Sequence, residues 1–486
     1  MIRAARRNWL FAGLLAAGLT LRVLAQFAYQ PALVYIDSGR YLSGDGAQDP
    51  LGYRALLWPL QRAGGLPAVA AVQHLLGLAM AITLYLVLRR RGLCRWAASL
   101  AAAPVLLDGY QLQAEQTIMP DVLFEALIVA GLGCLLAPGR PTARLAGPAG
   151  LLFGLAVDVR QAGEALIVVV PALLLACGPG WRRRLACAGL ACAGFALPVL
   201  GYLTAQYVTA GRFALTERGP DMLYARAAAA ADCATLRLPA DERSLCPSRQ
   251  DVAILGIDNM LGEHGGPLLA YQAAPGMKRV MAGRFAVAVL RQQPLTVTLA
   301  VAHDFMKLFA LTRDRSPGDP PISRWQFQLH YPTYPPAVTR SFVAQLRPGG
   351  GPPRADRSLA RILRGYQLHG GYTPGPVLLL ALLGALASLA TRASRPPAGP
   401  LGPRAASMLV LAVVLPVLLV SDGYEFSWRY QLPAVILLPA AGALGLAALI
   451  ARFRAELAAP AAEHIAGPVS ADNWPTAGTP AIWRLR

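Results

Sequence analysis

Long runs of apolar residues recur along the chain, and they constrain the fold more than any other feature. A helix needs about twenty apolar residues to cross the hydrocarbon core of a bilayer. Because 55% of the residues are hydrophobic and only 15% are charged, an ordinary soluble protein is excluded. We predict an all-α integral membrane protein. About ten transmembrane helices are expected, near residues 9–29, 66–88, 96–110, 119–137, 145–159, 164–180, 185–207, 374–391, 405–421 and 430–450.

Arginine clusters between these runs predict which ends of the spans face the cytoplasm. Basic residues near span ends stay on the cytoplasmic side, and clusters such as 89–91 and 182–184 contain no acid. With ten spans, both termini are then cytoplasmic. The first run is long enough to span and no small-residue cleavage site follows it. We therefore expect an uncleaved signal anchor in a bacterial cytoplasmic (inner) membrane.

The net charge of +19 does not predict nucleic-acid binding. It comes almost wholly from arginine, and the arginines are spread over the loops between spans instead of forming one basic patch. That distribution follows the orientation rule for membrane proteins. The lipid bilayer is an expected partner, and nucleic acid is not.

A long polar stretch interrupts the series of spans and divides the chain into modules. Residues 208–373 are too polar to span and predict an external, periplasmic domain. Within it, 277–312 has the spacing of amphipathic helices that lie on a membrane surface; a short extra span near 295–311 is the alternative. The other units are an N-terminal module of seven spans with an external loop, a C-terminal module of three spans and a disordered cytoplasmic tail, over residues 1–207 (loop 30–65), 374–454 and 455–486.

Two of the seven cysteines stand apart from the apolar runs. Cys233 and Cys246 lie in the polar stretch, thirteen residues from each other. We predict a disulfide between them, which would place this stretch in an oxidising compartment. Two free cysteines are the alternative.

Acidic residues of the spans and short loops gather on the face opposite the arginine clusters. The loop between the first two spans holds Asp37, Asp45 and Asp49 together with Arg40 and Arg54. Acidic residues have little influence on membrane insertion, so their distribution needs another cause. It indicates a polar site at the outer membrane surface.

This loop also carries a family resemblance. The order of an apolar helix, then IDSGRYL and then D-P-L-x-Y resembles the first external loop of polytopic GT-C glycosyltransferases related to protein O-mannosyltransferases and aminoarabinose transferases. Asp37 and Tyr41 match an acid and a tyrosine of that pattern. Ser38 replaces a second acid, and Asp49-Pro50 replaces the usual pair before the leucine. The resemblance extends to three further places: Glu115 and Asp121 around the fourth span, Arg160 between two spans, and Arg429-Tyr430 before the last span.

The resemblance implies a GT-C-like fold and an inverting glycosyltransferase. The donor would be a polyprenyl-phosphate sugar, and the acceptor a cell-envelope glycan, a lipid-linked glycan or a protein. A phosphate leaves without being protonated, so one carboxylate suffices, as the base that takes the acceptor proton. The resemblance assigns this role to Asp37. Arginines would meet the charge that grows on the phosphate, and Arg40, Arg160 and Arg429 are the candidates.

Several alternatives stay open. Asp37 could instead cap a short helix or pair with Arg40, and Asp45 or Asp49 could be the base. A divalent cation, Mg²⁺ or Mn²⁺, is conceivable because hard cations favour clustered carboxylates. Candidates for acceptor or metal contacts are Asp45, Asp49, Tyr41, Glu115, Asp121 and His369. At the level of function, the alternatives are a transporter or flippase of lipid-linked glycans and a membrane subunit without catalysis.

Overall fold

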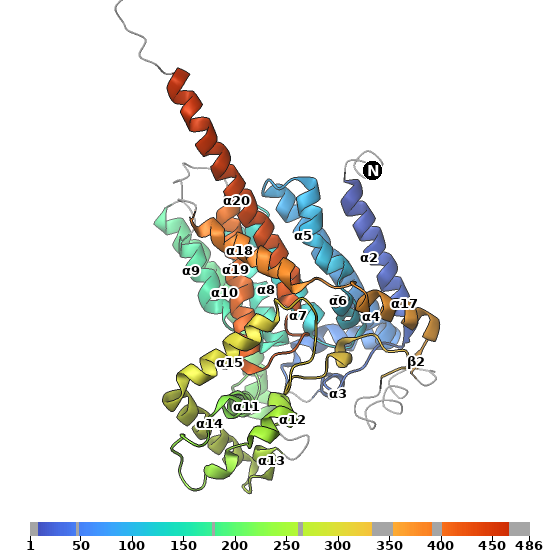
Figure 1. The fold of residues 1–486 in the computed structure, drawn as a ribbon, viewed down its shortest axis with the longest axis vertical. Coiled ribbons are helices and arrows are strands. Elements are labelled where there is room, and N and C mark those ends of the chain that lie inside the picture. The colour runs from blue at the N-terminus through green and yellow to red at the C-terminus, as the bar shows by residue number, and fades with distance from the viewer. Residues whose placement is uncertain are drawn as a thin grey trace, which may run out of the picture.

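The computed structural model describes residues 8–44, 48–176, 180–260, 266–332, 353–390 and 401–465. This part of the chain is almost wholly helical. One bundle contains the N-terminal and C-terminal helices, and a smaller group of helices covers one end of it (Figure 1). The bundle helices are α2 (Trp9–Ala28), α4 (Arg54–Arg90), α5 (Arg95–Leu107), α6 (Gly109–Gln116), α7 (Asp121–Leu136), α8 (Ala143–Val159), α9 (Leu166–Ala176), α10 (Trp181–Ala210), α18 (Gly375–Ala387), α19 (Pro403–Tyr424) and α20 (Leu432–Ile465).

Five helices are long and apolar enough to cross a membrane, so the chain is a multi-pass membrane protein. They are Trp9–Ala28, Leu51–Arg90, Trp181–Ala210, Pro403–Tyr424 and Leu432–Arg454. Each of the ten predicted spans overlaps a helix, but the helices at the other five are shorter than a full crossing. The figure of ten spans therefore stays a prediction.

Helix α4 contains a break that divides it into a surface part and a spanning part. Gly65 adopts φ +70°, in the left-handed region, and Gly64 beside it is also non-helical. Glycine takes up such a conformation without the steric cost of a Cβ, and Pro67 lacks the N–H that would continue the hydrogen-bond ladder. The sequence prediction that the second span starts near residue 66 agrees with this break.

The helices outside the bundle are α11 (Gly219–Ala230), α12 (Arg249–Asn259), α13 (Pro267–Ala270), α14 (Pro275–Gln292) and α15 (Pro294–Lys307). Their common core includes Tyr224, Leu245, Phe285 and Val289. The predicted disulfide between Cys233 and Cys246 is confirmed, with the two Cα atoms 6.0 Å apart.

Helices α14 and α15 correspond to the predicted amphipathic segment. They meet at an angle of 96°. The break occurs where Pro294 begins the second helix. Leu295, Leu299 and Met306 of α15 are all more than half exposed. By length and composition the two helices together could form one bent span. The structure thus agrees with the surface position and with the extra span.

The rest of the polar stretch packs elsewhere. Helix α17 (Arg357–Leu368) lies against α2. Strand β2 (Arg354–Ala355) pairs antiparallel with β1 (Tyr29–Gln30) at the end of α2, with Tyr29 opposite Ala355. The remaining elements are α3 (Ser38–Ser43) and the 3₁₀ helices Leu51–Tyr53, Gln161–Gly163, Arg243–Leu245, Ile322–Trp325 and Ser388–Ala390.

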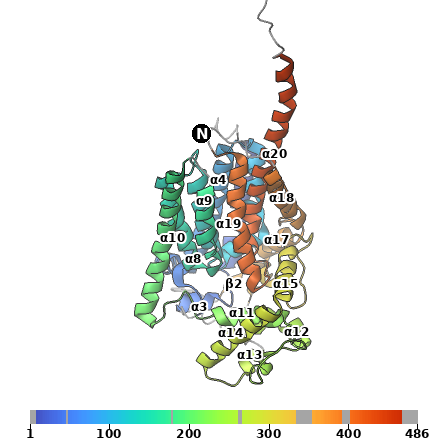
Figure 2. The same cartoon turned by 90° about the vertical axis from the view of Figure 1, so that its left-hand side faces the viewer.

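The described chain begins and ends at the same end of the bundle, away from α11 to α14 (Figure 1). A second view places α3 at the other end, next to the outer helices (Figure 2). Helix α20 continues to Ile465, past the start of the tail that was expected to be disordered from residue 455. The sequence there is rich in alanine, the strongest helix former. Residues 466–486 of that tail lie outside the described part.

Candidate functional site

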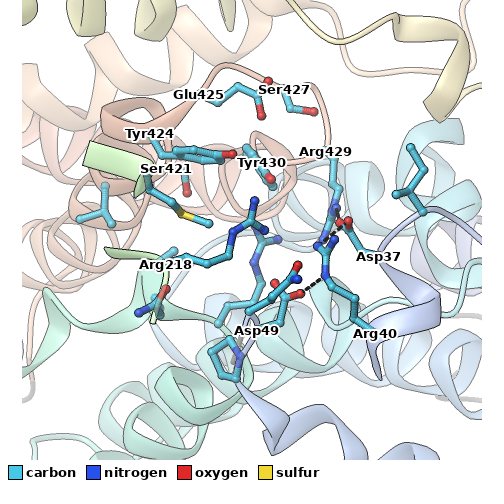
Figure 3. A pocket seen from close by; sticks show the side chains of 18 of the residues that line it. Asp37, Arg40, Asp49, Arg218, Ser421, Tyr424, Glu425, Ser427, Arg429 and Tyr430 are labelled. Atoms are coloured by element: carbon cyan, nitrogen blue, oxygen red, sulfur yellow. Dashed lines mark hydrogen bonds and ion pairs between the residues drawn. The ribbon is translucent and has the colours of Figure 1, made fainter. Parts of the chain in front are cut away.

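A cavity of about 590 Å³ lies where the bundle meets the outer helices. Two walls face each other across it (Figure 3). We call the residues from the bundle end the inner wall and those from α11, α14 and the turn before α11 the outer wall. Charged and aromatic residues of the inner wall include Asp37, Arg40, Tyr41, Asp49, Arg160, Glu425, Arg429 and Tyr430. The outer wall consists of Glu217, Arg218, Asp221, Met222 and Arg279.

Main-chain contacts hold the Asp37 loop against the end of α6. Leu33 N–H donates to Gln116 O, and Ile118 N–H donates to Leu33 O, both at 2.9 Å. Ser38 is buried; its Oγ donates to Ile118 O and accepts from Tyr35 N–H, both at 2.8 Å. Ser38, which replaces the second acid of the GT-C pattern, therefore has a structural role here.

Asp37 lies between two arginines. Its Oδ1 accepts from Arg40 Nη2 at 2.6 Å, and its Oδ2 accepts from Arg429 Nη1 at 2.8 Å. It precedes α3, but its side chain makes no capping hydrogen bond. The pairing with Arg40 that was an alternative to catalysis is thus present, and the capping role is not.

The ion pairs continue on both sides of Asp37 and form a chain of alternating charge. Arg40 Nε donates to Asp49. Arg429 Nε donates to both oxygens of Asp121, at 2.9 and 3.0 Å. Arg160 donates to Asp121 as well. Residues from three connections between bundle helices and from α7 are thereby joined in one network.

The two inner carboxylates differ in access. The Asp37 side chain retains 19% of its surface exposed, whereas that of Asp121 retains 2%. A base must reach the proton that it takes, so Asp37 is accessible to a ligand in the cavity and Asp121 is not. Asp121 instead orients Arg160 and Arg429.

The charges around Asp37 keep it ionised. Burial by itself raises the pKa of Asp37, but the attraction of the Arg40 and Arg429 guanidinium groups outweighs it and holds the pKa below its ordinary value. The Arg429 guanidinium is itself buried. Burial lowers its pKa, but the charges of Asp121 and Asp37 raise the pKa by more, so that it lies above its ordinary value. Both ions therefore persist at neutral pH.

Aromatic rings fix the two innermost arginines. The Arg160 guanidinium lies 4.8 Å from the centre of the Tyr430 ring. That of Arg429 lies 5.3 Å from the same ring and 5.4 Å from the ring of Trp325. Such stacking favours arginine over lysine. Trp325, at the end of the 3₁₀ helix Ile322–Trp325, was not anticipated from the sequence.

The outer wall was also missed by sequence reasoning. Glu217 accepts from Arg212 at 2.7 Å and from Arg279 at 2.5 Å. Arg218 and Asp221 follow it in the stretch TERGPD. This charged stretch comes directly after the seventh predicted span, on the same face as Asp37, and that position was a usable signal.

Other predicted site residues lie away from the cavity. Glu115 is fully buried inside the bundle, where it accepts from Arg22 at 2.7 Å and contacts His74 at 3.0 Å. This contact pairs Arg22 of α2 inside the bundle. His369 is exposed and contacts Gly365 O at the end of α17. Asp45 lies outside the described residues.

The carboxylates of the described site do not fit a divalent cation. Asp37, Asp49 and Asp121 each bind an arginine instead of facing one another. No group of three His, Cys, Asp or Glu side chains with the arrangement of a metal site occurs among the residues that the structure describes. Glu115, another candidate ligand, is in a separate buried cluster.

No protein-family model matches the chain, and no curated protein sequence matches it. Among solved structures, the chain is similar to the archaeal oligosaccharyltransferase AglB from Archaeoglobus fulgidus, in complex with an inhibitory peptide and a dolichol-phosphate. The identity is 13% and the TM-score 0.41, and the match covers 97% of this chain and 53% of that one. The chain thus spans about half the length of that oligosaccharyltransferase.

Proposed function

We propose that the protein is an inverting membrane glycosyltransferase, which moves a sugar from a polyprenyl-phosphate donor to a cell-envelope acceptor at the outer face of the cytoplasmic membrane. The observation that carries the proposal is Asp37: an accessible carboxylate, kept ionised by two guanidinium groups, in a cavity at the end of a membrane bundle. The resemblance of the Asp37 loop to the GT-C pattern supports the same chemistry.

The reaction needs one base and a cationic environment. Asp37 takes the proton of the acceptor hydroxyl, and the acceptor oxygen forms a bond to the anomeric carbon. The bond from that carbon to the phosphate oxygen breaks, and its electron pair leaves with the polyprenyl phosphate. Because attack and departure occur on opposite sides, the anomeric configuration is inverted.

The inner arginines have donors left for the phosphate. A guanidinium group has five N–H donors, and the ion pairs of Arg40, Arg160 and Arg429 use only some of them. The remaining donors suit a phosphate oxygen, since bonds between two ions are stronger than neutral ones. Tyr41 and Asp49 line the same cavity and are candidates for acceptor contacts.

The test is sugar transfer in membranes that contain the wild type, Asp37→Asn or Asp49→Asn, with radiolabelled polyprenyl-phosphate sugars and native envelope acceptors. Asp37→Asn keeps the shape but removes the base, and we expect a loss of about 100-fold or more, within the range of general base catalysis. Asp49→Asn should retain most of the activity. Transfer that survives in Asp37→Asn but not in Asp49→Asn would move the base to Asp49. No transfer from any donor, together with transbilayer movement of the lipid, would instead establish a flippase.

A further inference from the structure

Arg218 differs from the other arginines of the cavity. Arg40, Arg160, Arg279 and Arg429 each form an ion pair with a carboxylate. The Arg218 side chain makes no hydrogen bond or ion pair within the described part of the chain, although it lines the cavity. Figure 3 shows it extending from the outer wall into the space in front of the inner wall.

The position of Arg218 places it opposite the proposed base. It is close enough to interact electrostatically with Asp37 and Asp49 across the cavity, and with Asp221 of α11. It makes a salt bridge with none of them. A partly buried cation with uncommitted donors is unfavourable unless an anion binds there.

The charge of the cavity limits which anion that is. Among described residues, the lining contains as many carboxylates as arginines: Asp37, Asp49, Glu217, Asp221 and Glu425 against Arg40, Arg160, Arg218, Arg279 and Arg429. There is no surplus of positive charge to neutralise a diphosphate. One free guanidinium suits a single negative charge.

We propose that Arg218 binds the phosphate of the donor and selects a phosphodiester, with one negative charge, over a diphosphate-linked lipid. The inference rests on the proposed function and names the donor class more narrowly. It adds a phosphate contact from the outer wall to those proposed for the inner arginines, so the donor bridges the two walls: its phosphate lies against Arg218 while its anomeric carbon faces the acceptor beside Asp37.

Binding without turnover tests this assignment. The purified protein in detergent is titrated calorimetrically with two probes that share a lipid and differ in charge, farnesyl methyl phosphodiester and farnesyl diphosphate. The wild type should bind the diester more tightly. Arg218→Gln should weaken diester binding about tenfold or more, because a hydrogen-bonded contact between two ions is lost. Arg218→Lys, which keeps the charge but loses the planar donor fork, should lie between the two.

A matched control and a reversed preference sharpen the test. Arg237→Gln removes the same charge from an exposed position elsewhere among the outer residues, and it should leave binding unchanged. Glu217→Gln releases Arg279 from its carboxylate, and it should shift the preference toward the diphosphate. Diester binding that is unchanged in Arg218→Gln overturns the proposal, as does a wild type that prefers the diphosphate. If Arg218→Gln does not fold, Arg218→Lys takes its place, provided that its melting temperature equals that of the wild type. Unchanged diester binding in Arg218→Lys would then overturn the proposal.

The outcomes also separate this inference from the proposed function. If the wild type transfers sugar but diester binding does not depend on Arg218, the transferase function stands and the phosphate assignment is wrong. Binding that depends on Arg218 without transfer from any donor supports the anion site and contradicts the transferase. Inorganic phosphate as a competitor shows whether the lipid contributes: competition equal to that of the diester would overturn the lipid-phosphate assignment.

Discussion

At the scale of single residues, the site depends on how Asp37 is held. Arg40 and Arg429 bind different oxygens of the same carboxylate, at 2.6 and 2.8 Å. Two such contacts restrict its rotation and favour the ionised form. The cost is a weaker base, since a carboxylate with a depressed pKa has less affinity for the acceptor proton. Asp37 is therefore suited to a reaction in which the proton is taken late, as the bond to the anomeric carbon forms.

This arrangement predicts a pH dependence. In the wild type, kcat/KM should stay constant at neutral pH and fall only in acid, as pH drops through the depressed pKa of Asp37. Arg40→Met removes one of the cations, so the pKa rises and the acidic limb should move to higher pH, by about 1–3 units for the loss of a close opposite charge. The measurement is the pH profile of sugar transfer by both proteins.

The matched control for that profile is Arg54→Met, which changes an arginine of the same loop that stacks on Trp58 instead of binding Asp37. Its acidic limb should coincide with that of the wild type. An acidic limb that stays in place in Arg40→Met would show that another group titrates.

At the scale of elements, the inner wall depends on one close approach. The 3₁₀ helix Leu51–Tyr53 touches the end of α8, and a Cβ on Gly52 would lie 2.5 Å from the carbonyl carbon of Asp158. Real Cβ atoms do not come so close to backbone, so only glycine fits here. The contact fixes Asp49 and Pro50, which precede the helix, next to Arg160, which follows α8.

Gly52→Ala should therefore displace the loop from α8. We expect a loss of stability of about 1–3 kcal/mol, typical of overpacking, and a loss of transfer activity that is larger than the fall in melting temperature explains. The control is Gly13→Ala in α2, where an added Cβ meets no atom within 4 Å. Full activity of Gly52→Ala would mean that the Asp49 segment does not need this position.

At the scale of the whole molecule, the cavity exists only while the outer helices stay docked on the bundle. Arg226 of α11 makes this connection: it is buried and donates to the main-chain oxygens of Asp422 and Tyr424 at the end of α19, and to Asp304 of α15. Arg313 makes a second one, with Asp108 at 2.8 Å.

Arg226→Met should release the outer wall while the bundle remains folded. Removing one partner from a buried ion pair costs about 3–5 kcal/mol, although Lys307 still pairs with Asp304 at 2.8 Å. We expect faster proteolysis in the outer helices and a strong loss of transfer at normal membrane insertion. Arg237→Met, at an exposed position, should change neither. Proteolysis and activity that both equal the wild type would show that other contacts suffice for docking.

The sequence alone determined those features that depend on neighbours along the chain. The positions of the apolar helices, the break before residue 66 and the pairing of Cys233 with Cys246 follow from local composition and short spacing. So does the Asp37 to Arg40 contact, because residues three apart lie side by side on one helical turn.

Only the tertiary structure decided which distant residues meet. Asp121 lies beneath Arg429, more than three hundred positions away, and Arg218 reaches the cavity from the outer helices, whereas Glu115 turns into the bundle toward Arg22. Each of these outcomes depends on how helices rotate and pack against one another. The depth of a charged residue in the membrane can be predicted from its distance to the end of a span. The residue that it contacts depends instead on how the helices pack across the bundle.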